Sequence, residues 1–301
     1  MVPVHNAENA LEGLVARIVA ALGSPGREVE VVLVDDGSCD SSWLAIQQQC
    51  RTRPCVRGLR LMRNYGQHNA LLAGIRATRY DQIVTLDDDL EQPPEAIPEL
   101  LDALEREEVD VVYGTRAGRR KGVLREREAR LFRGLLRRGL GVGGAGGIAP
   151  LRAFRGELRE VFARGHGPHV SIDALLGWGT TRFAAVDVEY GPRAAGKSSY
   201  GVGRRLRHAI LEVTGFTTLP LPLASVLGFV MTAFGLGVLV YVIGRYVIDG
   251  GSVSGFPFLA SIISVFAGAQ LLALGVIGEY LARVHERTMD RPPYVIRESD
   301  S

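Results

Sequence analysis

Three consecutive carboxylates, Asp87-Asp88-Asp89, are the strongest local signal for chemistry in this chain. They follow a short apolar run, Ile83–Leu86, which has the composition of a buried strand. Carboxylate oxygens gathered in a loop suit Mg²⁺ or Mn²⁺, and such an ion can also bind phosphate oxygens. For a triplet taken alone, a solvated acidic turn is the alternative interpretation. The position directly after an apolar run favours a metal site.

A second acidic pair supports the same interpretation. Asp35-Asp36 follows the β-branched run Val29–Val34 and precedes Gly37. In open α/β sheets, ligands bind beyond the carboxyl ends of the strands. Two acidic clusters, each placed after an apolar run, therefore predict one binding site at the carboxyl edge of a sheet.

A strongly basic stretch indicates a negatively charged partner. Ten cationic side chains lie in it, interleaved with leucine and phenylalanine: Arg116, Arg119, Arg120, Lys121, Arg125, Arg127, Arg130, Arg133, Arg137 and Arg138. This spacing predicts a basic amphipathic helix at a membrane surface, with a solvated arginine-rich face as the alternative. A lipid phosphate is largely ionised at pH 7, since its second pKa is about 6. It needs cations, whereas a sugar hydroxyl needs a carboxylate base.

Strand-like and helix-like segments alternate up to about Glu189. The expected strands are Val2–Val4 as the end of a first strand, Val29–Val34, Leu59–Met62, Ile83–Leu86 and Val109–Tyr113. The expected helices are Ala10–Leu22, Trp43–Cys50, His68–Arg79 and Pro94–Arg106. This alternation predicts an α/β domain with a mostly parallel sheet covered by helices.

The charge of the chain is unevenly distributed. The 301 residues carry 68 charged side chains, but the 63 residues from Leu219 to Leu281 contain only Arg245, Asp249 and Glu279. A charged, core-forming body is thus followed by an almost uncharged segment, which excludes a disordered chain and a wholly soluble enzyme. The three cysteines fit neither a disulfide framework nor a zinc site, so we interpret them as ordinary thiols.

Two apolar stretches, Leu221–Val247 and Phe256–Leu281, are each long enough to cross a bilayer as a helix. A pair of buried core helices is the alternative. Positive side chains flank the pair on its outer sides, at Arg204, Arg205 and Arg207 before it and at Arg283, Arg287, Arg291 and Arg297 after it. Because positive flanks stay in the cytoplasm, we expect cytosolic termini and an external tip near residues 250–252.

Several motifs occur in a fixed order along the chain. They are Val2-Pro3-Val4-His5-Asn6, Val34-Asp35-Asp36-Gly37-Ser38-x-Asp40, Arg63-Asn64-Tyr65-Gly66-Gln67, Asp87-Asp88-Asp89-Leu90-Glu91-x-Pro93-Pro94-Glu95, Val112-Tyr113-Gly114-x-Arg116, Arg193-x-x-Gly196-x-Ser198-x-Tyr200, Gly278-Glu279-Tyr280-Leu281-x-Arg283 and Arg291-Pro292-x-Tyr294. This set resembles the family 2 glycosyltransferases with the GT-A, Rossmann-like fold. It is most similar to the polyisoprenyl-phosphate glycosyltransferases, the group of dolichol-phosphate mannose synthases and bacterial undecaprenyl-phosphate sugar transferases.

The resemblance implies a role for each matching residue. A nucleoside diphosphate sugar, with uridine as the preferred base, would be the donor. Its nucleotide would be held by Pro3, His5, Asp35, Asp36, Asp87 and Asp88. The metal, Mg²⁺ or Mn²⁺, would be held by Asp89, Asp87 and Glu91. The catalytic residues would be Asp87, Asp89, Arg116 and Arg193, and the acceptor phosphate would be held by Arg130, Arg133, Arg193, Lys197 and Ser198.

The sequence as a whole predicts an inverting, metal-dependent transfer of a sugar to a polyprenyl phosphate at the inner membrane. The expected parts are a cytosolic GT-A domain (1–200), a basic juxtamembrane helix (201–218), two transmembrane helices (219–282) and a cytosolic tail (283–301). The partners would be the donor, the lipid phosphate and the bilayer, with no nucleic acid. Similar proteins form tetramers, which implies a homo-oligomer.

Two other functions fit the sequence. One is a membrane glycosyltransferase that uses a saccharide hydroxyl, with Asp173 as the base. The other is a membrane scaffold that keeps the fold without turnover, which is suggested by departures from the family motifs such as His5 in place of Tyr and Ser199 in place of Lys.

Overall fold

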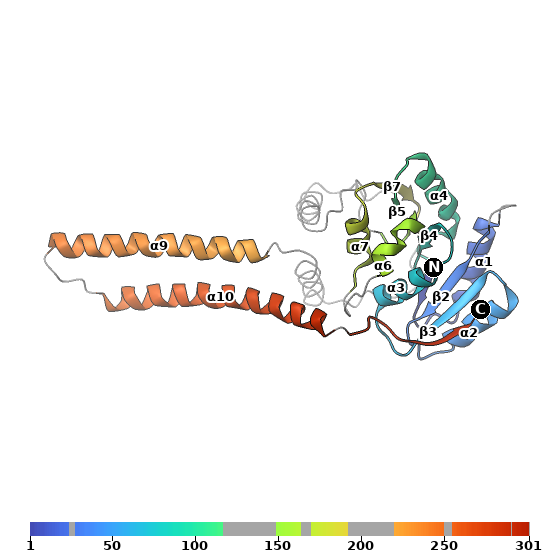
Figure 1. Ribbon diagram of the computed structural model, residues 1–301, viewed down its shortest axis with the longest axis horizontal. Helices are drawn as coiled ribbons and strands as arrows, with labels where there is room; N and C mark the ends of the chain where they lie inside the picture. Colours follow the sequence, from blue (N-terminus) through green and yellow to red (C-terminus); the bar gives the residue numbers. More distant parts are fainter. Residues whose placement is uncertain are drawn as a thin grey trace. The chain divides into compact units, whose positions relative to one another are not determined.

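The computed structural model describes residues 1–23, 28–116, 149–163, 170–191, 220–249, 255–289 and 291–300. The chain forms two units (Figure 1). The first, which we call the α/β unit, contains residues 1–200 and 290–301. The second, the helical unit, contains residues 201–289.

The α/β unit has the predicted alternation of strands and helices. In chain order its elements are β1 (Val2–Val4), α1 (Leu11–Leu22), β2 (Val31–Asp35), α2 (Ser42–Thr52), β3 (Val56–Leu61), α3 (Gln67–Ala77), β4 (Gln82–Thr85), η1 (Pro94–Ala96), α4 (Ile97–Arg106), β5 (Val111–Arg116), β6 (Arg152–Arg155), η2 (Gly156–Leu158), α6 (Arg159–Ala163), α7 (Ile172–Gly179), β7 (Phe183–Val188) and β8 (Ile296–Asp300). The five strands and four helices expected between Val2 and Tyr113 are present, with ends that differ by a few residues. The basic amphipathic helix expected between residues 116 and 138 lies almost entirely outside the described residues.

The strands form two four-stranded sheets, in the orders β1-β2-β3-β8 and β4-β6-β5-β7. Two hydrogen bonds join them, from Met1 N to Val84 O (2.8 Å) and from Leu86 N to Met1 O (3.3 Å). This is the pattern of a parallel pair, so β1 and β4 lie side by side with the same direction. The carboxyl ends of β1, β2, β3 and β4 therefore meet at one edge.

The sheet is mixed, which corrects the prediction of a mostly parallel one. Strand β6 lies between β4 and β5 and is antiparallel to both, and β8 is antiparallel to β3. Only β1–β2, β2–β3 and β5–β7 are parallel among the assigned pairs. Strands β6 and β8 are not among the expected strands, because Arg-Ala-Phe-Arg and Ile-Arg-Glu-Ser-Asp are not apolar runs. Strand β7, Phe-Ala-Ala-Val-Asp-Val, was also missed.

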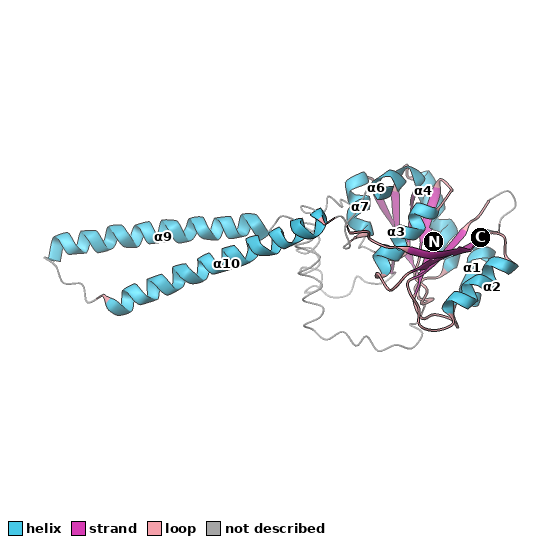
Figure 2. Ribbon diagram, turned by 60° about the horizontal axis from the view of Figure 1, so that its bottom comes forward, coloured by secondary structure: helices cyan, strands magenta, loops and turns pink. Residues whose placement is uncertain are grey.

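Helices cover both faces of the sheet (Figure 2). On one face, buried side chains of α1, α2 and α4 pack on Val31 and Leu33 of β2. On the other, those of α3, α6 and α7 pack on Val32 and Val34. Strand β2 is thus buried on both faces, which explains why its sequence is a continuous apolar run rather than an alternating one.

The helical unit consists of α9 (Pro220–Asp249) and α10 (Phe256–Thr288), which lie side by side (Figures 1 and 2). Gly235 permits close contact, since a Cβ atom there would lie 2.6 Å from the Phe266 ring. Within the described residues, Val265–Ala282 of α10 is long and apolar enough to cross a membrane, and α9 contains a shorter apolar stretch, Gly228–Tyr241.

The C-terminal residues return to the α/β unit. The predicted tail, 283–301, is not one segment, since α10 continues to Thr288 and β8 pairs with β3. The ring of Tyr294 lies 5.6 Å below the guanidinium of Arg76 in α3. Because β3 would otherwise be an edge strand with free backbone groups, β8 shields it from pairing with other chains.

This arrangement predicts that removal of residues 291–301 destabilises the α/β unit. The deletion exposes the β3 edge and removes the contact between Tyr294 and Arg76. We expect the midpoint of thermal unfolding to fall by roughly 5 °C or more, with aggregation on heating. Trp43 and Trp178, the two tryptophans of the chain, both lie in this unit, so tryptophan fluorescence reports its unfolding.

Glu298→Gln is the matched control for this deletion. Its carboxylate lies 3.8 Å from Arg60 and is largely exposed, so the pair contributes little to stability. The role of β8 would be contradicted by a deletion whose unfolding midpoint equals that of the control.

Candidate active site

Residues that follow four parallel strands meet at the carboxyl edge of the sheet. His5, after β1, donates its backbone N–H to Asp88 Oδ2, after β4, at 3.0 Å. The His5 ring lies 3.2 Å from the backbone oxygen of Asp36, after β2, and 3.3 Å from the side-chain nitrogen of Asn64, after β3. The structure thus brings together the two acidic clusters that the sequence placed at one edge.

Asp35 and Asp36 are both buried, and their carboxylates hold the surrounding loops. Asp36 accepts the backbone N–H groups of Tyr65 (2.7 Å) and Gly66 (2.9 Å), while burial raises its pKa. Asp35 accepts the N–H of Ser38 at 3.0 Å. These contacts shape the edge, and direct contact of either carboxylate with a donor stays a prediction.

Gly37 is required where these loops cross. Its φ is +65°, and a Cβ atom there would lie 2.5 Å from backbone atoms of Arg63 and Asn64. No other residue type combines this left-handed conformation with so close a backbone approach. The glycine after the acidic pair therefore lets the β2 and β3 loops pack together.

Asp87 is held by neutral donors. Its Oδ1 accepts the Gln67 amide at 2.5 Å and its Oδ2 accepts the Gln92 amide at 3.2 Å, while its own N–H donates to Gln92 Oε1 at 2.8 Å. The pKa of Asp87 is raised to about 6, chiefly by burial. The charges of Asp89 and Asp88 also raise it, whereas the hydrogen bond from Gln92 and the charge of Arg152 lower it. A cation bound here would relieve this repulsion.

The other carboxylates of the loop are oriented by backbone N–H groups. Asp88 accepts from His5, and burial raises its pKa. Asp89 Oδ1 accepts from Glu91 N at 3.1 Å across Leu90, which has a left-handed φ of 57°. Within the described residues, no three acidic, histidine or cysteine side chains enclose an ion by themselves. The oxygen donors fit Mg²⁺ or Mn²⁺ nonetheless, since Mg²⁺ commonly takes one or two carboxylates and completes its shell with water and substrate phosphates.

Tyr190 is a site residue that the sequence did not reveal. Its hydroxyl donates to Gly114 O at 2.8 Å, and the guanidinium of Arg116 lies 5.7 Å from its ring. Burial and the charge of Asp87 raise its pKa. The next residue, Gly191, donates its N–H to Glu91 O at 2.8 Å. Arg116 is thereby placed beside the acidic loop on the exposed end of β5.

The remaining predicted site residues are either buried in a strand or lie outside the described residues. Pro3 is buried in β1, where it pairs with Val34, so its contact with a nucleobase stays a prediction. The predicted juxtamembrane helix (201–218) lies outside the described residues. The same is true of the predicted acceptor residues Arg130, Arg133, Arg193, Lys197 and Ser198.

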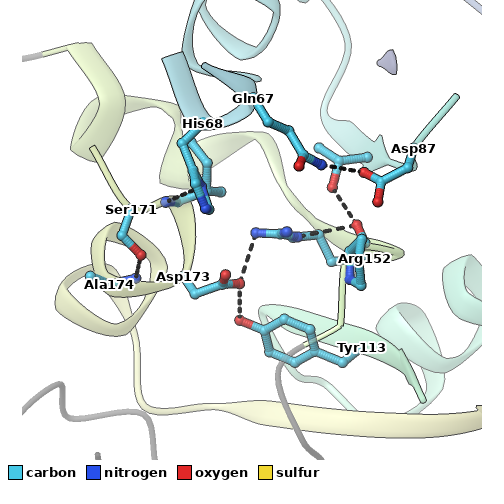
Figure 3. A network of polar contacts seen from close by, with 11 residues as sticks. Gln67, His68, Asp87, Tyr113, Arg152, Ser171, Asp173 and Ala174 are labelled. Atoms are coloured by element: carbon cyan, nitrogen blue, oxygen red, sulfur yellow. Dashed lines mark hydrogen bonds and ion pairs between the residues drawn. The ribbon is translucent and has the colours of Figure 1, made fainter. Parts of the chain in front are cut away.

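A polar network lies behind the acidic loop (Figure 3). Arg152 and Asp173 are both buried, and Arg152 Nη1 lies 2.7 Å from Asp173 Oδ1. The Tyr113 hydroxyl donates to the same oxygen at 3.0 Å. His68 contributes its ring, whose Nδ1 accepts the Ile172 N–H at 3.4 Å. Of these residues, only Asp173 has a role predicted from the sequence, as the base of the alternative function.

A family model described as glycosyl transferase family 2 matches residues 1–162. The chain belongs to glycosyl transferase family 2. It is therefore an enzyme, a glycosyltransferase, and the site at the carboxyl edge of its sheet is the candidate active site.

Two relatives of this glycosyltransferase match it over nearly its whole length. Both are named undecaprenyl-phosphate 4-deoxy-4-formamido-L-arabinose transferase. The protein from Shewanella sediminis is 35% identical over 99% of this chain and 91% of its own length. The protein from Edwardsiella ictaluri is 34% identical over 99% of this chain and 92% of its own.

Solved structures support the GT-A-like fold. A mannosyltransferase from Pyrobaculum calidifontis, in complex with GDP-Man and Mn²⁺, matches with a TM-score of 0.52 and 18% identity. The match covers 96% of this glycosyltransferase and 86% of that chain. Glucosyl-3-phosphoglycerate synthase from Mycobacterium tuberculosis, in complex with phosphoglyceric acid, also matches with a TM-score of 0.52, at 22% identity over 71% of this chain and 79% of that one.

The half-buried ring of His68 predicts a pH dependence of stability. Burial lowers its pKa below the ordinary 6.5, and the charge of Arg152 lowers it further while Asp173 opposes this. Between the lowered folded-state pKa and 6.5, the unfolded chain binds a proton that the folded chain does not. The stability that depends on neutral His68 is thus complete above pH 6.5 and is lost as the pH falls.

We expect His68→Gln to lose less stability than the wild type between pH 7.5 and pH 5.5. The difference is at most about 1.4 kcal/mol, the cost of withholding one proton over one pH unit. Urea unfolding followed by tryptophan fluorescence measures it at both pH values. An equal loss of stability in the two proteins would contradict a neutral His68 in the folded protein.

Proposed function

We propose that this enzyme transfers a sugar from a nucleoside diphosphate sugar to a polyprenyl phosphate, of the undecaprenyl type, at the cytoplasmic face of the inner membrane. The observation that carries the proposal is the full-length similarity to undecaprenyl-phosphate sugar transferases, which extends through both long helices. The acidic loop at the sheet edge supplies the chemistry of a diphosphate donor site. A single displacement at the anomeric carbon would invert its configuration.

The donor site is built from the ends of four strands. His5 and Asn64 present polar groups beside Asp36, at the end where the nucleoside would lie. Asp87, Asp89 and Glu91 would hold a divalent cation, which supplies positive charge to the diphosphate leaving group when bound. Arg116, placed by Tyr190, would contribute a guanidinium to phosphate oxygens. The preference for uridine rests on the family resemblance.

The state of Asp173 supports a phosphate acceptor over a sugar hydroxyl. A hydroxyl must lose a proton, so it needs a carboxylate whose oxygens are available. The Oδ1 of Asp173 is instead bound by Arg152 and Tyr113, and the residue is buried. An ionised lipid phosphate needs no base. Arg130, Arg133, Arg193, Lys197 and Ser198 are its proposed partners.

We further propose that α9 and α10 form a transmembrane hairpin with both chain ends in the cytosol. The two helices pack on each other, and their described apolar side chains are mostly exposed, as for surfaces that contact lipid. The arginines that flank the pair give the orientation. Assembly into a homo-oligomer is proposed from the family resemblance alone.

A scaffold without turnover, the other function considered from the sequence, is set aside because the chain belongs to glycosyl transferase family 2. Its only support is the set of departures from the family motifs, such as His5 and Ser199. The acidic residues that would bind the metal are all present, and their carboxylates lie in one loop.

The proposal predicts that radiolabelled sugar from one nucleoside diphosphate sugar appears in the lipid phase of membranes that contain the enzyme. Asp89→Asn should reduce this transfer by about two orders of magnitude or more, because it removes a charge from the cation site. Excess EDTA should do the same. A panel of nucleotide sugars, extracted with organic solvent after incubation, measures the transfer and identifies the sugar.

Asp102→Asn is the control for that substitution. Asp102 is an exposed residue of α4 whose ion pair with Arg106 is long, at 3.7 Å, so its loss should leave transfer unchanged. Full transfer by Asp89→Asn would refute the metal site, whereas label in no lipid with any donor would refute the proposed acceptor.

The topology predicts which introduced thiols react from outside the cell. In a background without Cys39, Cys50 and Cys55, a cysteine at Ser252 should react with an impermeant maleimide in intact cells. A cysteine at Ser299 should react only after the cells are opened, because the C-terminus lies in the cytosol. The reverse pattern would place the termini outside, and reaction at both positions in intact cells would exclude a hairpin.

A further inference from the structure

Arg152 is a buried cation in the middle of the sheet. It begins β6, and its register partners are Thr85 in β4 and Tyr113 in β5. Its side chain is 3% exposed. Burying a charge is costly unless that charge is paired, so the contacts of this guanidinium are informative.

Asp173 is the partner of this guanidinium. The distance from Arg152 Nη1 to Asp173 Oδ1 is 2.7 Å, and Tyr113 donates to the same oxygen. Arg152 Nε donates to Pro150 O at 3.3 Å, which also accepts the Thr85 hydroxyl at 3.2 Å. Helix α7, which carries Asp173, therefore fixes the position of a cation that belongs to the sheet.

The same guanidinium lies close enough to the acidic loop to act on it. Thr85, its register partner, is two residues before Asp87, and Figure 3 shows the Arg152 side chain between Asp173 and the strand end that carries Asp87. The charge of Arg152 lowers the pKa of Asp87. The two side chains that donate hydrogen bonds to the Asp87 carboxylate, Gln67 and Gln92, are both neutral.

We propose that Asp173 is a positioning residue for metal binding: it holds Arg152 and balances its charge, so that Asp87 remains available to a divalent cation. The inference rests on the metal site of the proposed function. Without Asp173, an unbalanced guanidinium would compete with the metal for Asp87. This role also explains why a carboxylate is present near the site of an enzyme whose acceptor needs no base.

Removing the charge of Asp173 and removing the charge of Arg152 should have opposite effects on Mn²⁺ affinity. Asp173→Asn keeps the shape and the acceptor oxygen but leaves Arg152 unbalanced, so the affinity for Mn²⁺ should fall about ten-fold. Arg152→Gln removes the competing cation, so the affinity should equal or exceed that of the wild type. The double variant, with a neutral pair, should return to within about two-fold of the wild type.

The experiment is a titration of the full-length protein in detergent with Mn²⁺ alone, with free Mn²⁺ measured by electron paramagnetic resonance. Tryptophan fluorescence and far-ultraviolet circular dichroism verify that each variant is folded. If Asp173→Asn fails to fold, Arg152→Gln and the double variant carry the test. A ten-fold loss of affinity in either of these would overturn the proposal, because the competing cation is then absent.

Two controls separate charge balance from structural damage. Asp110→Asn removes the same charge from an aspartate that is also paired with arginines, Arg182 and Arg155, at the opposite end of β5, and should leave Mn²⁺ affinity unchanged. Tyr113→Phe removes a hydrogen bond to Asp173 without changing any charge, and should change the affinity less than two-fold. The proposal would be overturned if either control lost as much Mn²⁺ affinity as Asp173→Asn.

Further outcomes separate this inference from the proposed function. Unchanged Mn²⁺ affinity in folded Asp173→Asn, with transfer abolished, would identify Asp173 as a base and overturn the positioning role and the phosphate acceptor together. Unchanged affinity with normal transfer would overturn the positioning role alone. No binding of Mn²⁺ by the wild type would overturn the metal site and, with it, this inference.

Discussion

The rest of the structure depends on how a cluster of carboxylates is kept in place at one edge of the sheet. Like charges this close repel each other, and burial raises the pKa of Asp36, Asp87 and Asp88. Asp35 is paired with Arg60, at 3.4 Å, and also accepts the N–H of Ser38. The other carboxylates accept neutral N–H groups: Asp36 from Tyr65 and Gly66, Asp87 from Gln67 and Gln92, Asp88 from His5, and Asp89 from Glu91. Neutral donors stabilise a carboxylate without cancelling its charge, so the edge as a whole keeps its attraction for cations.

Helix α3 links this edge to the rest of the α/β unit. Its first residue, Gln67, binds Asp87, and the next, His68, lies beside the Arg152–Asp173 pair. Near the other end of the helix, Arg76 contacts Tyr294 and donates to Phe162 O at 2.6 Å. The C-terminal segment that follows the helical unit therefore packs against the same rigid element that positions the acidic loop.

The sequence predicted the elements that depend on local patterns and missed those that depend on distant partners. Continuous apolar runs located β2 and the buried first four residues of β5, because a strand buried on both faces has no polar side. A short apolar run also located β4, in which half-buried and buried residues alternate. Strands β6 and β8 have polar sequences and are strands only through their neighbours. The acidic loop was found because its residues are consecutive, whereas Tyr190 and the Arg152–Asp173 pair are brought to the site by folding. No local signal in the sequence joins Arg152 to Asp173, 21 residues away.

The Arg152–Asp173 pair also shows why the GT-A fold alone does not decide the acceptor. Asp173, a carboxylate at the start of α7, is a candidate base when only the sequence is considered. The availability of its oxygens depends on a second residue, Arg152 on β6, which contacts the same carboxylate in the core. An enzyme with a hydroxyl acceptor needs that oxygen available, and one with a phosphate acceptor does not. The fold therefore admits both chemistries, and the contacts of this one carboxylate favour the proposed phosphate acceptor.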